Sequence, residues 1–204
     1  MSHSHGNDKY NYHVPIIADF SSNVWFKPLP VEFYHRLSGA LPKITDYPHP
    51  EAGELREALA CFHQLEVGNV WVTNGSVEGI FLLAQAFPYA KSCVVYPSFS
   101  EYENACKRYQ QTITFLSNLE KLSNIIVTPD LLWFGNPNNP DGKVVSLHRI
   151  EKILKEFPAT IVVIDEAFGD LCPGFESAVS LIRKYNNLVI LRSFTKAFAS
   201  TVYA

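Results

Sequence analysis

The 204-residue sequence lacks any apolar run close to the roughly 18 residues that a membrane-spanning helix needs. Residues 1–13 (MSHSHGNDKYNYH) contain no apolar core of the kind that secretory signals carry. The formal net charge is −3, so the chain has no excess of positive charge to attract nucleic acid or an anionic lipid surface. We therefore expect no nucleic-acid or membrane partner, and any phosphate must be bound at a local site.

The four cysteines are scattered and form no C-x-x-C pair or other metal-ligand spacing, which argues against a disulfide framework or a zinc site. They indicate reduced thiols and hence a cytoplasmic location. His3 and His5 lack further ligands at suitable spacing, so we expect no metal site. With 47% hydrophobic and 18% charged residues, the chain is typical of a globular protein and not of a disordered one.

Short apolar or β-branched runs alternate with helical patterns from about residue 50 onward. Several runs are apolar at every position, which is typical of strands buried on both faces of a parallel sheet. This alternation predicts an α/β fold with a doubly wound, mostly parallel sheet. The predicted strands are residues 69–73, 92–96, 112–116, 131–135, 160–164 and 188–191, and the predicted helices are residues 51–65, 76–87, 100–110, 147–157 and 177–185.

The first 48 residues differ from the rest of the chain. They contain five prolines and little periodicity apart from a short helix expected at residues 31–38. We therefore predict an extended N-terminal arm over residues 1–48 and one main domain over residues 49–204.

Ligands in an open α/β sheet bind beyond the carboxyl ends of the strands, so the residues at those points are candidates for a site. Residues 74–79 (NGSVEG) offer backbone N–H groups and a hydroxyl at a helix start, which suits a phosphate. The equal alternative is that Ser76 serves as an N-cap, with Glu78 in the first turn. Phe99 follows the next strand, where its ring either stacks on a flat ligand or belongs to the core.

Three further strand exits carry polar residues. Residues 136–142 (NPNNPDG) have the composition of a turn, but they also make a rigid loop that can aim amide donors at a ligand. Asp165 and Glu166 follow a buried strand, where a carboxylate needs a partner, and a structural ion pair would account for one of them. Lys196 lies beyond the last strand and is either a nucleophilic amine at a cleft or a solvated surface lysine.

In combination, the segments NPNNPDG (136–142), IDEAF (164–168) and SFTK (193–196) resemble motifs of the aspartate-aminotransferase superfamily of fold type I pyridoxal-phosphate enzymes. The resemblance covers nearly the whole chain and implies that residues 49–204 form the cofactor-binding large domain. It also implies that Lys196 forms the aldimine with pyridoxal 5'-phosphate and later moves a proton at the substrate Cα. Asp165 would pair with the protonated pyridine nitrogen, which keeps the ring an electron sink.

The same resemblance assigns the other contacts to the cofactor. It implies that Asn139 donates to the phenolic oxygen and that Phe99 stacks on the ring. It further implies that the phosphate is held by Gly75, Ser76, Val77 and Ser193, the glycine and valine acting through their backbone N–H groups. In the superfamily a tyrosine matching Tyr47 reaches the phosphate in the neighbouring subunit, which implies a homodimer.

Residues 45–59 and 72–80 resemble the branch that contains histidinol-phosphate aminotransferase and threonine-phosphate decarboxylase. This implies a small phosphorylated, amino-acid-like substrate. Residues 5–8 (HGND), residues 97–106 (PSFSEYENAC) and Phe168, where many aminotransferases have tyrosine, favour the decarboxylase.

The sequence departs from the superfamily after Lys196, because no arginine follows it here. Relatives continue to a phosphate-binding arginine and to a small domain with the arginine that binds the substrate carboxylate. The placement of that carboxylate decides between transamination and decarboxylation, so the sequence leaves both reactions open. It predicts an enzyme of this branch, with a truncated, catalytically inactive remnant and an unrelated α/β binding module as alternatives.

Overall fold

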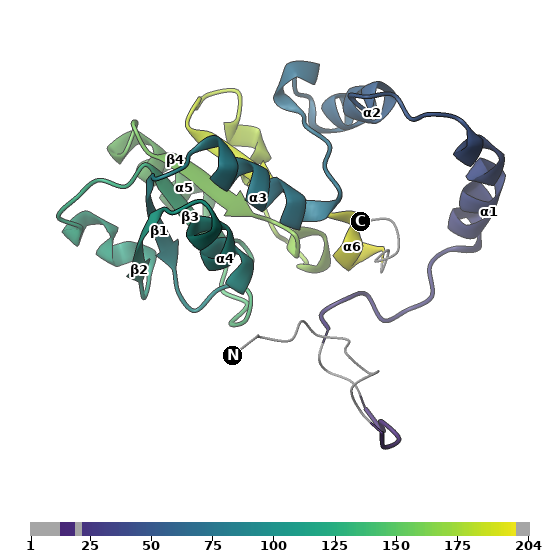
Figure 1. Ribbon diagram of the computed structural model, residues 1–204, viewed down its shortest axis with the longest axis horizontal. Coiled ribbons are helices and arrows are strands. Elements are labelled where there is room, and N and C mark those ends of the chain that lie inside the picture. The colour runs from purple at the N-terminus through teal and green to yellow at the C-terminus, as the bar shows by residue number, and fades with distance from the viewer. Residues whose placement is uncertain (1–12, 19–21, 199–204) are drawn as a thin grey trace.

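The computed structural model describes residues 13–18 and 22–198, so His3 and His5 lie outside the described residues. Its centre is a five-stranded sheet in the order β2-β1-β3-β4-β5, in which every pair of neighbours is parallel (Figure 1). This is the doubly wound α/β sheet that the sequence predicts. The strands are β1 (Lys91–Val95), β2 (Thr112–Leu116), β3 (Leu131–Gly135), β4 (Ile161–Asp165) and β5 (Leu188–Leu191).

Helices cover both faces of the sheet. The helices α3 (Gly75–Ala86) and α4 (Ser100–Arg108) pack on one face, and α5 (Leu147–Glu156) packs on the other (Figure 1). Successive strand residues alternate between the two layers: Trp133 packs towards α3 and α4, whereas Phe134 packs towards α5, and both are almost completely buried. The continuously apolar strands therefore form cores on both faces.

The strand order brings four strand exits to one edge of the sheet. The chain runs from β1 to β2 on one side of β1, and β3 then pairs with the other side of β1. The connections after β1 and β3 therefore lead away from each other, which leaves a crevice at the carboxyl ends of these two strands. Phe99 follows β1, and residues 136–142 follow β3. Asp165 ends β4, and Ser193 follows β5.

One predicted strand is wrong. Residues 67–69 form a 3₁₀ turn (Val67–Asn69), and residues 70–73 belong to no helix or strand and pair with no strand of the described chain. A β-strand needs a neighbouring ladder, and here the Trp71 side chain is 79% exposed beside an open groove. The other five strands match the predicted ranges within one residue.

The helix predicted over residues 177–185 is also wrong, because only a 3₁₀ turn, η6 (Ala178–Leu181), forms there. The Ala178 N–H donates to Glu166, the Val179 N–H donates to the Ser177 hydroxyl, and Ile182 closes an i→i+3 hydrogen bond to Val179. The segment is therefore wound too tightly for an α-helix. The predicted helices at 51–65, 76–87, 100–110 and 147–157 are present, with ends within two residues of the prediction.

The N-terminal part of the described chain contains α1 (Val31–Ala40) and α2 (Gly53–His63), which lie apart from the sheet in Figure 1. No residue of α1 is buried. This part contacts α6 (Phe194–Ala197): the Trp25 N–H donates to the Lys196 carbonyl at 2.8 Å, and the Phe33 and Phe198 rings stack with centroids 5.7 Å apart. The domain boundary at residue 48 stays a prediction.

The cysteines Cys61, Cys93, Cys106 and Cys172 are all free. Within the described ranges, no helix has the length and apolar character needed to cross a bilayer. In the same ranges no group of three or more histidine, cysteine, aspartate or glutamate side chains is arranged to hold a metal ion.

Candidate active site

A cavity of about 250 Å³ lies at the carboxyl edge of the sheet. Its walls come from the starts of α3 and α4, the loop after β3, the end of β4 and the segment that leads into α6. Most residues predicted to bind a ligand line this one space: Gly75, Ser76, Val77, Phe99, Asn139, Asp165, Ser193 and Lys196. Tyr47 does not line the cavity, and its side chain is fully exposed.

The α3 helix begins at the cavity wall with backbone donors available. Gly75 has a positive φ of 74°, and its N–H donates to the Thr73 carbonyl at 2.8 Å. The first-turn N–H groups of Ser76 and Val77 have no acceptor among the described residues. Unpaired N–H groups at the positive end of a helix favour an anion, so this wall of the cavity suits a phosphate.

The alternative role of Ser76 as an N-cap is wrong. The N-cap is Asn74, which makes no side-chain cap hydrogen bond, and Ser76 lies inside the first turn. Glu78 accepts from the Asn74 N–H at 2.5 Å, so its carboxylate is used at the entry to the helix. The Ser76 hydroxyl is therefore not used for capping, and Ser76 lines the cavity.

Asp165 supplies a buried carboxylate to the cavity. Its side chain is only 7% exposed, with Oδ2 accepting from the Tyr102 hydroxyl at 2.9 Å and Oδ1 accepting from the Ala167 N–H at 3.0 Å. Burial raises the pKa of Asp165, while these hydrogen bonds and the charge of Lys196 act in the opposite direction. No lysine, arginine or histidine of the described chain lies within ion-pair distance of it. A cation at this end of the cavity would therefore be stabilised.

Tyr102 is a site residue that the sequence reasoning missed. It lines the cavity, stacks on Trp133 with ring centroids 6.1 Å apart, and meets Phe99 edge-on at 5.9 Å. Burial raises the pKa of Tyr102 well above its usual value, and the charge of Asp165 adds to this shift. The hydroxyl therefore stays protonated and donates to Asp165. Tyr102 lies on α4, three residues after Phe99, which is the N-cap of that helix, and the sequence alone does not show that its hydroxyl meets Asp165.

Two of the three asparagines in the loop after β3 stabilise the loop itself, and the third lines the cavity. The Asn136 side chain exchanges two hydrogen bonds with the Val145 backbone, and the Asn138 amide donates to the Pro97 carbonyl and to Asp141. Asn139 lines the cavity, and its side chain makes no hydrogen bond within the described chain. Of the three amides, Asn139 is therefore available to a ligand.

Gly135 explains how this loop can lie so close to the sheet. It is paired in register with Asp165, and a Cβ on Gly135 would lie 3.1 Å from the Asn138 Cα. The missing side chain leaves space beside the Asp165 carboxylate on the cavity floor.

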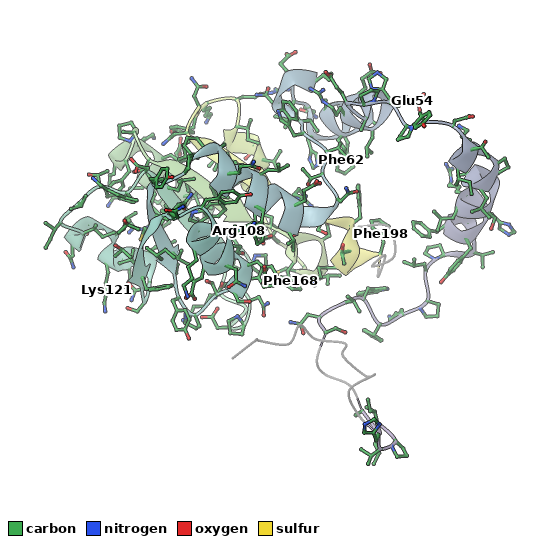
Figure 2. The ribbon with its side chains drawn as sticks, viewed as in Figure 1. Glu54, Phe62, Arg108, Lys121, Phe168 and Phe198 are labelled. Carbon is green, nitrogen blue, oxygen red and sulfur yellow. The ribbon has the colours of Figure 1, made fainter. Side chains whose placement is uncertain are left out.

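Lys196 lies on α6 and lines the cavity together with the start of α3. Its Nζ is 5.5 Å from the centroid of the Phe168 ring, and Figure 2 shows Phe168 near α6. Ser193 caps α6, with its hydroxyl oxygen accepting from the Thr195 N–H at 3.1 Å. The hydroxyl proton of Ser193 remains available to a ligand in the cavity.

Glu166 confirms the expected structural ion pair, because Arg192 lies 3.3 Å from its carboxylate. Asp165 and Glu166 point to opposite faces of the sheet, as successive strand residues do. Only Asp165 lines the cavity.

The cavity thus presents donors for an anion at one wall, a buried carboxylate with no cation in contact among the described residues, an aromatic ring and a primary amine. These features suit a ligand that carries an anionic group and a cationic atom and has a flat part to meet the ring. The chain matches the family described as "Aminotransferase class I and II" over residues 20–202. The chain belongs to this family.

Individual relatives agree with the fold. The chain is 37% identical to histidinol-phosphate aminotransferase of Francisella philomiragia subsp. philomiragia over 166 residues, which cover 74% of this chain and 46% of the relative. It is 32% identical to the structure of L-threonine-O-3-phosphate decarboxylase from Porphyromonas gingivalis, with a TM-score of 0.83, covering 89% of this chain and 56% of the other.

A histidinol-phosphate aminotransferase from Sinorhizobium meliloti, solved in complex with pyridoxal-5'-phosphate, has a similar fold at 20% identity and a TM-score of 0.77. It covers 87% of this chain and 51% of that chain. This chain therefore spans about half the length of the relatives that it matches.

Proposed function

We propose that this chain is the cofactor-binding part of a pyridoxal-phosphate enzyme that acts on a small phosphorylated, amino-acid-like substrate. The observation that carries the proposal is the Asp165 carboxylate, which is buried at the cavity floor with neutral hydrogen-bond donors and no cation in contact among the described residues. A protonated pyridine nitrogen is the partner that such a carboxylate lacks. The aminotransferase family supports the same cofactor.

The residues that line the cavity fit this cofactor. The N–H groups of Ser76 and Val77, together with the Ser193 hydroxyl, would bind the phosphate, and Gly75 would supply the turn that presents them. Phe99 would stack on the ring, and Asn139 would donate to its phenolic oxygen. When bound, the cofactor supplies an electron sink for the substrate carbanion.

Lys196 has two tasks in the proposed reaction. Its amine would bond covalently to the cofactor aldehyde and, once released by the substrate, would hold or deliver a proton at the substrate Cα. Asp165 would keep the ring nitrogen protonated throughout. The chain has Phe168, close to the Lys196 amine, where many aminotransferases have tyrosine. Phenylalanine has no hydroxyl to donate, so Asn139 would be the donor to the phenolic oxygen.

An absorbance titration with pyridoxal phosphate tests this proposal. The wild-type chain should give the absorbance band of a lysine-bound cofactor, and borohydride reduction should fix the mass of the cofactor on the peptide that contains Lys196. The variant Lys196→Ala should give neither signal, whereas Lys155→Ala, on α5 at the other face of the sheet, should give both. A folded wild-type chain without the band, or a band retained in Lys196→Ala, would contradict the proposal.

Two reactions are open to such a site. Relatives named as an aminotransferase and as a decarboxylase both match the chain. We propose threonine phosphate as the substrate of a decarboxylation and histidinol phosphate with 2-oxoglutarate as the substrates of a transamination. Release of carbon dioxide would indicate the first reaction, and transfer of the amino group to 2-oxoglutarate the second. Because the chain spans about half the length of these relatives, cofactor binding without turnover is the second candidate, favoured if the band forms and neither substrate reacts.

We also propose that the catalytic form is a homodimer and that it works in the cytoplasm. The Tyr47 side chain, which is fully exposed and does not line the cavity, supports a role at a neighbouring subunit, and the free cysteines support a reducing compartment. Sedimentation of the chain with and without cofactor tests the first statement.

A further inference from the structure

Glu166 is a buried carboxylate that the proposed chemistry does not use. It is 1% exposed and follows Asp165 directly, but its carboxylate lies on the other face of the sheet. Oε1 accepts from the Ala178 N–H at 2.8 Å, and Oε2 accepts from the Ser177 hydroxyl at 2.5 Å and from Arg192 at 3.3 Å. Its backbone N–H donates to the Leu191 carbonyl at 2.8 Å.

These contacts join three parts of the chain at the edge of the cavity: the end of β4, the segment before η6 and the end of β5. Arg192 is connected to the site through the chain, because it directly precedes Ser193, which lines the cavity. The guanidinium also donates to the Ser177 hydroxyl at 3.3 Å and to Asp170 at 2.5 Å, and it does not line the cavity. Its influence on a ligand must therefore pass through the backbone at Ser193.

The two carboxylates that hold Arg192 are not equivalent. The Glu166 side chain is fully buried, whereas that of Asp170 is 49% exposed. Water screens the exposed pair, so it contributes little, whereas separating Arg192 from the buried Glu166 carboxylate would leave a buried charge without its cation, which is costly. Glu166 is therefore the member that fixes the position of Arg192.

We propose that Glu166 is a positioning residue for the phosphate end of the cavity: through Arg192 it holds Ser193 in the cavity lining that Ser193 shares with the start of α3. This inference rests on the proposed function. Asp165 is anchored separately, by Tyr102 and Ala167 on the other face, so the ring-binding end is independent of Glu166. Loss of the Glu166 charge should then weaken binding of the cofactor phosphate and leave binding of the cofactor ring unchanged.

Comparing pyridoxal phosphate with pyridoxal, which lacks the phosphate, separates the two ends of the site. The dissociation constant of each ligand is measured for the wild-type chain, Glu166→Gln and the matched control Asp170→Asn. For Glu166→Gln we expect pyridoxal phosphate to bind about tenfold more weakly and pyridoxal to bind within about twofold of wild type, because the weakened hydrogen bonds join Glu166 to Arg192, Ser177 and Ala178 and none of them involves Asp165. Asp170→Asn should change both constants less than about twofold.

Ser177→Ala gives a second variant if Glu166→Gln fails to fold. It removes one donor to Glu166 and one acceptor from Arg192, and should weaken pyridoxal phosphate binding by about threefold without affecting pyridoxal. An equal loss for both ligands would show a general structural role and overturn the inference, as would no loss in a folded variant. If the wild-type chain binds neither ligand, the proposed function fails and not the role of Glu166 alone.

Discussion

Replacing Tyr102 by phenylalanine removes the hydroxyl that donates to the buried Asp165 carboxylate at 2.9 Å. The ring keeps its stacking on Trp133 and its edge contact with Phe99, so the loss is confined to one hydrogen bond. A hydrogen bond to a charged group contributes about 1.5–3 kcal/mol to stability. For a chain of this size we expect the melting temperature of the cofactor-free protein to fall by about 3–12 °C.

The loss of stability in Tyr102→Phe should depend on pH. Tyr102 lowers the pKa of Asp165 against the larger effect of burial, which raises that pKa. The hydroxyl therefore stabilises the folded state only where Asp165 is ionised. As the pH falls through the folded-state pKa of Asp165, the carboxylate is protonated and the difference between wild type and Tyr102→Phe should shrink.

Urea unfolding of the cofactor-free chain at several pH values measures this difference, and Tyr185→Phe is the matched control. Tyr185 also donates to a carboxylate, that of Glu151, at 2.8 Å, but this pair is only partly buried. The control should cost less stability than Tyr102→Phe. Equal losses, or a loss at Tyr102 that does not change with pH, would mean that Asp165 is not ionised in the folded chain and would remove the main support for a cationic ligand atom.

Two further substitutions test the floor of the cavity. Because burial raises the folded-state pKa of Asp165 above its usual 3.8, the folded state holds more protons than the unfolded state above that pH, so ionisation of Asp165 lowers stability as the pH rises. Asp165→Asn should therefore make the cofactor-free chain more stable than wild type at pH 7, and the difference should disappear towards pH 4. The same variant should not bind pyridoxal phosphate. A variant less stable than wild type at pH 7 would refute the predicted direction of the stability change. Gly135→Ala places a Cβ 3.1 Å from the Asn138 Cα and should cost about 1–3 kcal/mol in urea unfolding, whereas Gly68→Ala, with no atom within 4 Å of its Cβ, should be close to neutral.

The sheet was predictable because its strands are buried on both faces, which leaves continuous apolar runs in the sequence. The two errors in secondary structure fall where the local pattern does not fix the conformation. Residues 70–73 have a strand-like composition, but strand formation needs a neighbour, and Val70 and Trp71 instead line an open groove that also includes Phe62 and Phe198 (Figure 2). Residues 177–185 have a helical pattern, but the Ile182 N–H donates to the Val179 carbonyl three residues back, and only the short turn η6 forms.

The position of the site was predictable for a different reason. Parallel strands end at one edge of the sheet, so residues that follow separate strands meet there whatever their distance in sequence. Tyr102 was missed because its role depends on how α4 lies over Asp165, and no local pattern fixes that packing. Likewise, the sequence could not show that the Gly75 N–H is bonded to Thr73, which leaves Ser76 and Val77 as the available donors.

Asp165 and Glu166 show how a site residue differs from a structural one of the same type. Both are carboxylates at the end of β4, both are more than nine-tenths buried, and burial raises the pKa of both. Glu166 has a cation from the chain itself, Arg192, whereas Asp165 has only neutral donors in contact among the described residues. Burial alone would therefore not separate them. The lack of a contacting cation at Asp165 is what indicates a ligand. The ion pair of Glu166 with Arg192 is what connects Glu166 to Ser193 in the cavity lining.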